Sequence, residues 1–159
     1  SPFQVGTVGK FEGMGFMLLG RIKLVYPGGT WSEWYAQMDD GREGWLAEAQ
    51  GQYMMSFREE GVDIPTPDMV FVNAAIEIKG QHFKVDDVRK VRYAGSEGEL
   101  PFLFQQGFEA TSVDLRSRGG EFASILYGPD KVEIFVGRYA RFDEFQFDFL
   151  REIDGWRRA

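Results

Sequence analysis

Alternating apolar and polar residues dominate this chain, and the pattern is clearest in a long stretch from Phe16 to Tyr26. Near its end, Ile22 and Leu24 fall on one face of an extended chain, while Arg21 and Lys23 fall on the other. A period of two is typical of a β-strand with one buried face. The stretch is therefore predicted to be a strand.

Short strands separated by turns account for most of the remaining sequence. Strand character recurs at 31–38, 45–49 and 53–57, and again at 69–78, 83–93, 110–115, 122–127 and 132–136. Between them, Pro27-Gly28-Gly29 and Asp39-Asp40-Gly41 supply glycine where a tight turn needs a positive φ angle. Strands of this length, with a turn about every ten residues, are typical of small antiparallel barrels.

The sequence predicts a mostly β fold of two tandem small antiparallel barrel-like or curled-sheet units, followed by a short C-terminal helix. Residues 1–58 are expected to form the first β unit, 59–68 a linker, 69–141 the second β unit and 142–156 the helix. The linker is predicted because 58–68 reads REEGVDIPTPD, which combines two prolines, a glycine and four acids. Two separate barrels and one continuous sheet both fit this pattern.

The two halves resemble each other weakly at a constant offset. Gly13 matches Gly80, and Phe16 matches Phe83. Two explanations are open. The halves are products of an internal duplication, or they are alike only because alternating strands resemble one another.

The C-terminus has a different period. Five apolar residues recur at helical spacing: Phe142, Phe145, Phe149, Ile153 and Trp156. Asp143 is the expected N-cap, and Gly155 lies where a helix would end. The helix is expected either to pack on the β units or to dock a partner.

Composition and charge narrow the functional classes. The 159 residues carry a formal net charge of −7, which disfavours nucleic-acid binding because phosphate contacts need clustered Lys and Arg. The densest basic cluster, 89–92, is interpreted as the outer face of a strand. No uncharged stretch approaches the ~20 residues that span a bilayer, so no direct membrane insertion is expected. The absence of cysteine excludes thiol chemistry and fits a reducing, cytoplasmic location.

Known catalytic patterns are missing. His82 is the only histidine, and no serine lies in a G-x-S-x-G turn, so no catalytic triad is predicted. No glycine-rich phosphate loop is present, and the short Asp39-Asp40-Gly41 segment does not match a calcium loop. No catalytic residue, metal ligand or cofactor is therefore predicted, and the protein is expected not to be an enzyme.

An aromatic cluster is the most distinctive candidate site. Three of the four tryptophans fall between Trp31 and Trp45. On an alternating strand, Trp31 and Tyr35 share one face with Glu33, while Trp34 lies on the other. Large amphipathic rings anchor interfaces, but they also fill small cores, and the sequence leaves both roles open. The candidate binding residues are Trp31, Glu33, Trp34, Tyr35, Trp45, Glu97, Glu99 and Asp114.

These elements resemble a widespread bacterial family known as a domain of unknown function. The resemblance rests on W-x-E-W at 31–34, G-W-L at 44–46, G-E-L-P at 98–101 and V-D-L at 113–115, and it covers nearly the whole chain. Its motif positions here are Trp31, Glu33, Trp34, Trp45, Leu46, Glu99, Leu100, Pro101 and Asp114.

The resemblance implies a context rather than an activity. Relatives are often preceded by a zinc-ribbon-like segment with paired cysteines. Such a segment upstream would explain why this chain lacks cysteine and an initiator methionine, and the sequence leaves open whether one is missing. Their genes often lie near those for membrane-stress proteins of the phage-shock type, polyamine-synthesis enzymes and small membrane proteins. No catalytic residue is established in the family, so none is transferred.

Three functional hypotheses follow, and the oligomeric state stays open in all of them. The first is a non-enzymatic module that binds a protein partner through an aromatic-rich β surface, in a membrane-stress or membrane-associated system. The second is a carboxylate-dependent enzyme or cation-binding domain, which requires Glu33, Glu99 and Asp114 to converge in one pocket. The third is a polyamine-binding domain, because an acidic, aromatic-lined pocket suits polycations.

Overall fold

The computed structural model describes residues 1–49 and 51–151. Its elements, in chain order, are β1 (Val8–Phe11), β2 (Met14–Tyr26), β3 (Gly29–Met38), β4 (Glu43–Ala49), β5 (Gln52–Glu59), the 3-10 turn η1 (Pro67–Met69), β6 (Ala75–Ile78), β7 (Gln81–Gly98), β8 (Glu109–Ser117), β9 (Glu121–Tyr127), β10 (Val132–Ala140) and the 3-10 turn η2 (Phe142–Phe145). The mostly β prediction is confirmed.

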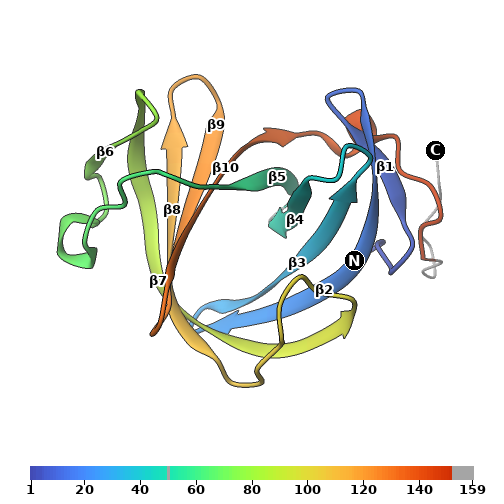
Figure 1. Cartoon of the computed structure of the whole chain (residues 1–159), viewed down its shortest axis with the longest axis horizontal. Helices are drawn as coiled ribbons and strands as arrows, with labels where there is room; N and C mark the ends of the chain where they lie inside the picture. Colours follow the sequence, from blue (N-terminus) through green and yellow to red (C-terminus); the bar gives the residue numbers. More distant parts are fainter. Residues whose placement is uncertain (50, 152–159) are drawn as a thin grey trace.

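The strands form one closed antiparallel barrel. The sheet order is β1-β2-β3-β4-β5-β10-β9-β8-β7-β6, and an additional pairing of β2 with β7 closes it. Eight strands, β2–β5 and β7–β10, thus make the wall, while β1 and β6 extend it on opposite sides (Figure 1). The expectation of two tandem units is corrected, because strands of both halves pair across β2–β7 and β5–β10 in a single sheet.

The two halves have the same plan. In β2 and β7 the register shifts at positions 67 residues apart, between Leu18 and Gly20 and between Val85 and Asp87. The hairpins that precede these strands also correspond, since β1 and β6 each lead into a two-residue turn. The sheet order is accordingly symmetric about the β5–β10 pair. An origin by duplication stays a prediction.

The predicted C-terminal helix is absent from the described part of the chain. Residues 142–145 form a single 3-10 turn, and Gln146 follows in the left-handed region with φ 51°. Arg141, rather than Asp143, occupies the N-cap position. The remaining predicted helical positions, from 152 onward, lie outside the described residues.

Two apolar cores lie on the outside of the barrel wall. On one side, Trp34, Leu46 and Met55 pack beneath Phe3 and Phe145 from the two ends of the chain. On the opposite side, the second core is covered by the connector before β6 and by β6 itself (Figure 1). Its wall residues include Val85, Val113, Leu115, Ile125 and Ile134. The sheet therefore buries much of its apolar surface outward, against these covering segments.

No helix within the described residues is long and apolar enough to cross a membrane.

Glycines at the two seams between the halves allow the barrel to close. Gly20 pairs with Gly98 across β2–β7, and a Cβ at Gly20 would lie 1.9 Å from the carbonyl oxygen of Glu99. At the β5–β10 seam, a Cβ at Gly137 would lie 1.8 Å from the carbonyl oxygen of Met55. Both obstacles are backbone atoms, so a side chain at either position forces the strands apart.

Gly20→Ala is predicted to lower the free energy of unfolding by about 3 kcal/mol, the cost of strong overpacking. Urea denaturation followed by circular dichroism measures it. Gly95→Ala is the matched control, because Gly95 lies in the same seam but has open space around its Cβ position. Equal stability of the two variants would contradict the role of Gly20 in closure.

Candidate functional site

The inward-facing residues of the barrel line a cavity of about 780 Å³ that is partly open to solvent. This volume is in the range of small-molecule pockets in proteins, about 300–1,000 Å³. All eight wall strands contribute lining residues: Ile22 and Leu24, Trp31 and Glu33, Trp45 and Ala47, Met54 and Ser56, Asp87 and Arg89, Ser112 and Asp114, Phe122 and Ser124, and Phe135 and Tyr139. A more open surface depression lies elsewhere, over 25–27 and 107–111.

Strand alternation decides which candidate residues face the cavity. On β3, Trp31 and Glu33 line the interior, whereas Trp34 belongs to the outer core and is 1% exposed. On β4, Trp45 lines the interior and the neighbouring Leu46 packs outside. The predicted aromatic cluster is thus divided between the two faces of the wall.

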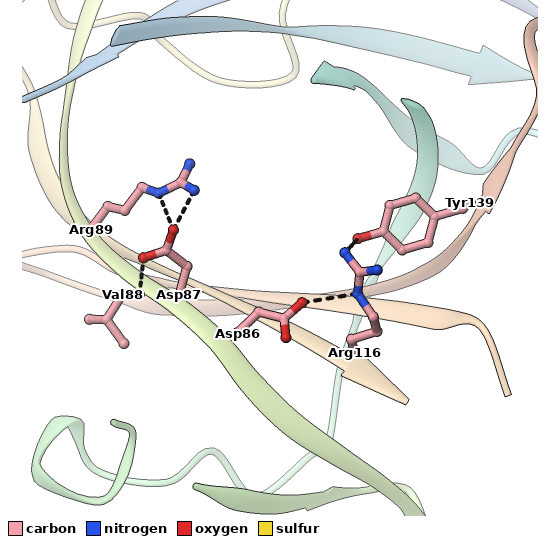
Figure 2. Close-up of polar contacts among 6 residues, drawn as sticks. All are labelled: Asp86, Asp87, Val88, Arg89, Arg116 and Tyr139. Carbon is pink, nitrogen blue, oxygen red and sulfur yellow. Dashed lines mark hydrogen bonds and ion pairs between the residues drawn. The ribbon is translucent and has the colours of Figure 1, made fainter. Parts of the chain in front are cut away.

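A β-bulge brings two consecutive acids into the cavity. Because the register shifts between Val85 and Asp87, both Asp86 and Asp87 line the interior. Arg89, two residues further, donates from Nε to Asp87 Oδ2 at 2.7 Å. Figure 2 shows Asp87 and Arg89 on one side of β7 and Val88 on the other. The charged pair therefore belongs to the interior.

The Arg89 guanidinium also lies on aromatic rings. Its Cζ is 4.7 Å from the ring centroid of Tyr26 and 5.9 Å from that of Trp31. Both distances are within cation–π range. An organic cation is thus already held inside the barrel by a carboxylate and two aromatic faces, supplied by the chain itself.

A second charged group lines another part of the wall. Arg116 donates from Nε to Asp86 at 2.9 Å and from a terminal nitrogen to the Tyr139 hydroxyl at 3.1 Å (Figure 2). Glu133, on β10, is flanked by Arg58 at 3.4 Å and Lys131 at 3.7 Å. These acids are all compensated by cations of the chain.

Glu33 and Asp114 form no ion pair of this kind within the described residues, although the charges of Arg89 and Arg116 act on Asp114. Glu33 Oε2 accepts a hydrogen bond from the Trp31 indole at 2.9 Å, and within the described residues no group donates to its other oxygen or to Asp114. Both side chains keep some accessible surface, because they border the cavity, although protein surrounds them. They belong to β3 and β8, which β2 and β7 separate in the sheet, and both line the cavity, where the charge of Asp114 acts on the Glu33 carboxyl group.

Burial raises the pKa of both carboxyl groups. For Glu33, burial raises the pKa above 4.5, the Trp31 hydrogen bond lowers it, and the nearby Asp114 charge raises it. For Asp114, burial outweighs the charge of Arg89 and raises the pKa from 3.8 to about 6. Asp87 and Asp86 add to this effect, and Arg116 opposes it. Asp114 therefore changes charge close to neutral pH.

Two serine hydroxyls in the cavity are also without partners. Ser56 on β5 and Ser112 on β8 are 6% and 8% exposed and line the cavity. Neither hydroxyl has a hydrogen-bond partner in the described parts of the chain. The one fully buried polar side-chain atom without a partner in the described residues is the Trp34 indole nitrogen, so these two hydroxyls keep contact with the cavity and are available to a molecule inside it.

Aromatic residues of the loop between β7 and β8 cover part of the cavity. Phe102 lines it, with ring centroids 6.2 Å from Trp45 and 6.3 Å from Tyr93. Phe104 stacks on Tyr93 at 5.9 Å, and Phe108 approaches the same ring at 4.9 Å. The loop thus adds an aromatic wall beside the carboxyl groups.

The remaining candidate residues lie elsewhere. Tyr35 is 7% exposed and packs against Trp45 at 5.7 Å. Glu97 pairs with Arg21 at 3.0 Å, and Glu99 is exposed and does not line the cavity. The hypothesis that Glu33, Glu99 and Asp114 converge is therefore reduced to Glu33 and Asp114.

Sequence reasoning missed the interior arginines and their partners. The cluster at 89–92 was interpreted as an outer face, which fits the exposed Lys90 and Arg92 but not Arg89, which lines the cavity. The paired acids of Asp86-Asp87 in an alternating strand were the available sign of a bulge. No group of three or more acidic or histidine side chains in the described residues is placed to hold a metal ion.

Comparison with known proteins gives a family but no activity. The family described as "Domain of unknown function (DUF4178)" matches residues 4–142. No curated protein and no solved structure matches the chain.

Asp114→Asn is predicted to change how stability depends on pH. The native state holds the Asp114 proton more tightly than the unfolded chain between about pH 4 and 6, so the free energy of unfolding of the wild type falls as pH rises through this window. The free energy of unfolding of the variant does not fall in this window, so at pH 7 it should exceed that of the wild type by up to roughly 3 kcal/mol. Urea unfolding between pH 4 and 8 measures it, with the exposed connector variant Asp63→Asn as control. Parallel curves for wild type and Asp114→Asn would contradict the prediction.

Proposed function

We propose that this chain, which belongs to the family described as Domain of unknown function (DUF4178), is a non-enzymatic protein. Its proposed function is to bind a small organic molecule inside the barrel. The observation that carries this proposal is the cavity of about 780 Å³ with a polar and charged lining. A barrel that served only as a scaffold would fill its interior with apolar side chains, as small barrels commonly do.

The energetics of the lining support a ligand. Removing a carboxylate from water is costly unless it is paired, and neither Glu33 nor Asp114 contacts a cation in the described structure. The hydroxyls of Ser56 and Ser112 add two hydrogen-bonding groups that border the same cavity. Sites that reduce stability in this way are commonly functional sites.

The positions of the tryptophans bear on the hypothesis that an aromatic surface binds a protein partner. Trp31 and Trp45 face the cavity and Trp34 the outer core, so these three rings offer no common outer surface to a partner. A protein partner, and a setting in a membrane-stress system, stay predictions. A small molecule inside the barrel uses the same aromatic residues without exposing them.

A carboxylate-dependent reaction in the same cavity is the second candidate. It is favoured by the pKa of Asp114, about 6, which suits a group that gives and takes protons near neutral pH. In this case a molecule recovered after incubation with the protein would be chemically changed. In the binding protein it would be recovered intact.

Filling the cavity is predicted to abolish ligand retention. Ser112→Phe places a ring into the cavity, whereas Ser96→Phe places one at an exposed position of β7. We expect native mass spectrometry, after incubation with a small-molecule cell extract, to show a 1:1 adduct with wild type and with Ser96→Phe. Ser112→Phe, shown to be folded by circular dichroism, should lose at least about tenfold in occupancy. Absence of an adduct with wild type, or its persistence in Ser112→Phe, would refute the proposed function.

A further inference from the structure

We infer that the molecule which the cavity takes is an organic ammonium ion, bound by the carboxylates of Glu33 and Asp114 beside the aromatic wall of Trp31, Trp45 and Phe102. This inference rests on the proposed function and specifies its ligand class. It assigns the two carboxyl groups as ligand-binding residues.

Charge balance inside the barrel points to a cation. Among the acids that line the cavity, Asp86, Asp87 and Glu133 each contact an arginine or a lysine of the chain. Glu43 and Glu48 lie near the two ends of β4. Glu33 and Asp114 are the interior pair without a bonded cation among the described residues. One ammonium ion between them would supply the missing counter-charge.

One cationic side chain of the protein is already bound in this cavity by a carboxylate and aromatic rings. Arg89 is held by the Asp87 carboxylate and by the faces of Tyr26 and Trp31. Glu33 and Trp31, joined by their own hydrogen bond on β3, two strands away, also combine a carboxylate with a ring. A second cation therefore finds the chemistry that already binds the first.

The other polar groups define the remainder of the ligand. The hydroxyls of Ser56 and Ser112 can accept further N–H groups or donate to an oxygen. Trp45 and Phe102, 6.2 Å apart, provide an apolar surface. An anionic ligand is disfavoured, because Arg89 and Arg116 are engaged by Asp87 and Asp86, and the free carboxylates would repel it.

Binding is expected to depend on pH through groups on several strands. Protonation of Asp114 and Glu33 removes the attraction. The other charges that act on Asp114 are those of Arg89 and Arg116 and of their partners Asp87 and Asp86. Affinity for an amine should fall as pH is lowered from 8 to 5, because the amine itself stays protonated over this range.

Three indole probes test the charge preference by isothermal titration calorimetry on the whole chain: tryptamine, tryptophol and indole-3-propionate, which carry an amine, a hydroxyl and a carboxylate on the same two-carbon side chain. Spermidine, an aliphatic polyamine, is the fourth probe. At pH 8 we expect tryptamine or spermidine to bind at least about tenfold more tightly than tryptophol and indole-3-propionate. A preference for tryptamine identifies an aromatic monoamine, and a preference for spermidine identifies an aliphatic polyamine.

Charge-removing variants locate the site. Glu33→Gln and Asp114→Asn should each weaken amine binding about tenfold or more. Each variant should also make amine binding less dependent on pH than it is in the wild type. Glu77→Gln and Asp63→Asn are the matched controls, because both remove an exposed carboxylate outside the cavity. These controls should bind as the wild type does.

Several results overturn the inference. One is equal or tighter binding of tryptophol or indole-3-propionate, another is unchanged amine binding by both Glu33→Gln and Asp114→Asn, and a third is no binding of either amine. In each case the proposed function still stands if the cell-extract adduct forms with wild type and is lost in Ser112→Phe. If that adduct is also absent, both fail.

Discussion

The close approach of backbone to backbone at two seams is the constraint on which this structure depends. The β2–β7 and β5–β10 pairs join residues far apart in the sequence, and each seam places a glycine where a Cβ would meet a carbonyl oxygen within 2 Å. Closure removes the open edges from the wall and leaves only β1 and β6 as sheet ends. Without these contacts the two halves would be open curled sheets, and no enclosed interior would exist.

Closure also separates the tasks of the two wall faces. The bulges in β2 and β7 reverse the alternation, so that Leu18 and Val85 face outward while Ile22 and Arg89 face inward. The outer face packs against the chain ends on one side and the connector on the other. A third apolar cluster, which includes Ile22, Leu24 and Tyr93, borders the cavity, so the interior combines apolar side chains with charges.

The same division explains what the sequence could and could not predict. Period-two patterning located the strands and the turns, because it is a local property of each segment. It could not say that Trp34 and Leu46 face an outer core while Trp31 and Trp45 face a cavity, since both faces of the wall are apolar. The pairing of β2 with β7 is non-local and left no sign in either strand. Phe142 and Phe145 had helical spacing, but that spacing also suits a 3-10 turn that lays aromatic rings on a core.

The balance of stability in the interior argues for function. Asp87 pairs with Arg89 on the same strand, and Asp86 pairs with Arg116 on the neighbouring strand β8, so these charges are satisfied. Asp114 makes no hydrogen bond in the described structure, and Glu33 makes one, to its own strand. Their burial therefore costs stability without binding one part of the fold to another. Apolar residues at these two positions would serve the fold better, as they do on the outer face of the same strands. The two carboxyl groups instead present hydrogen-bond acceptors and negative charge to the cavity. Only a molecule that enters the cavity can interact with them.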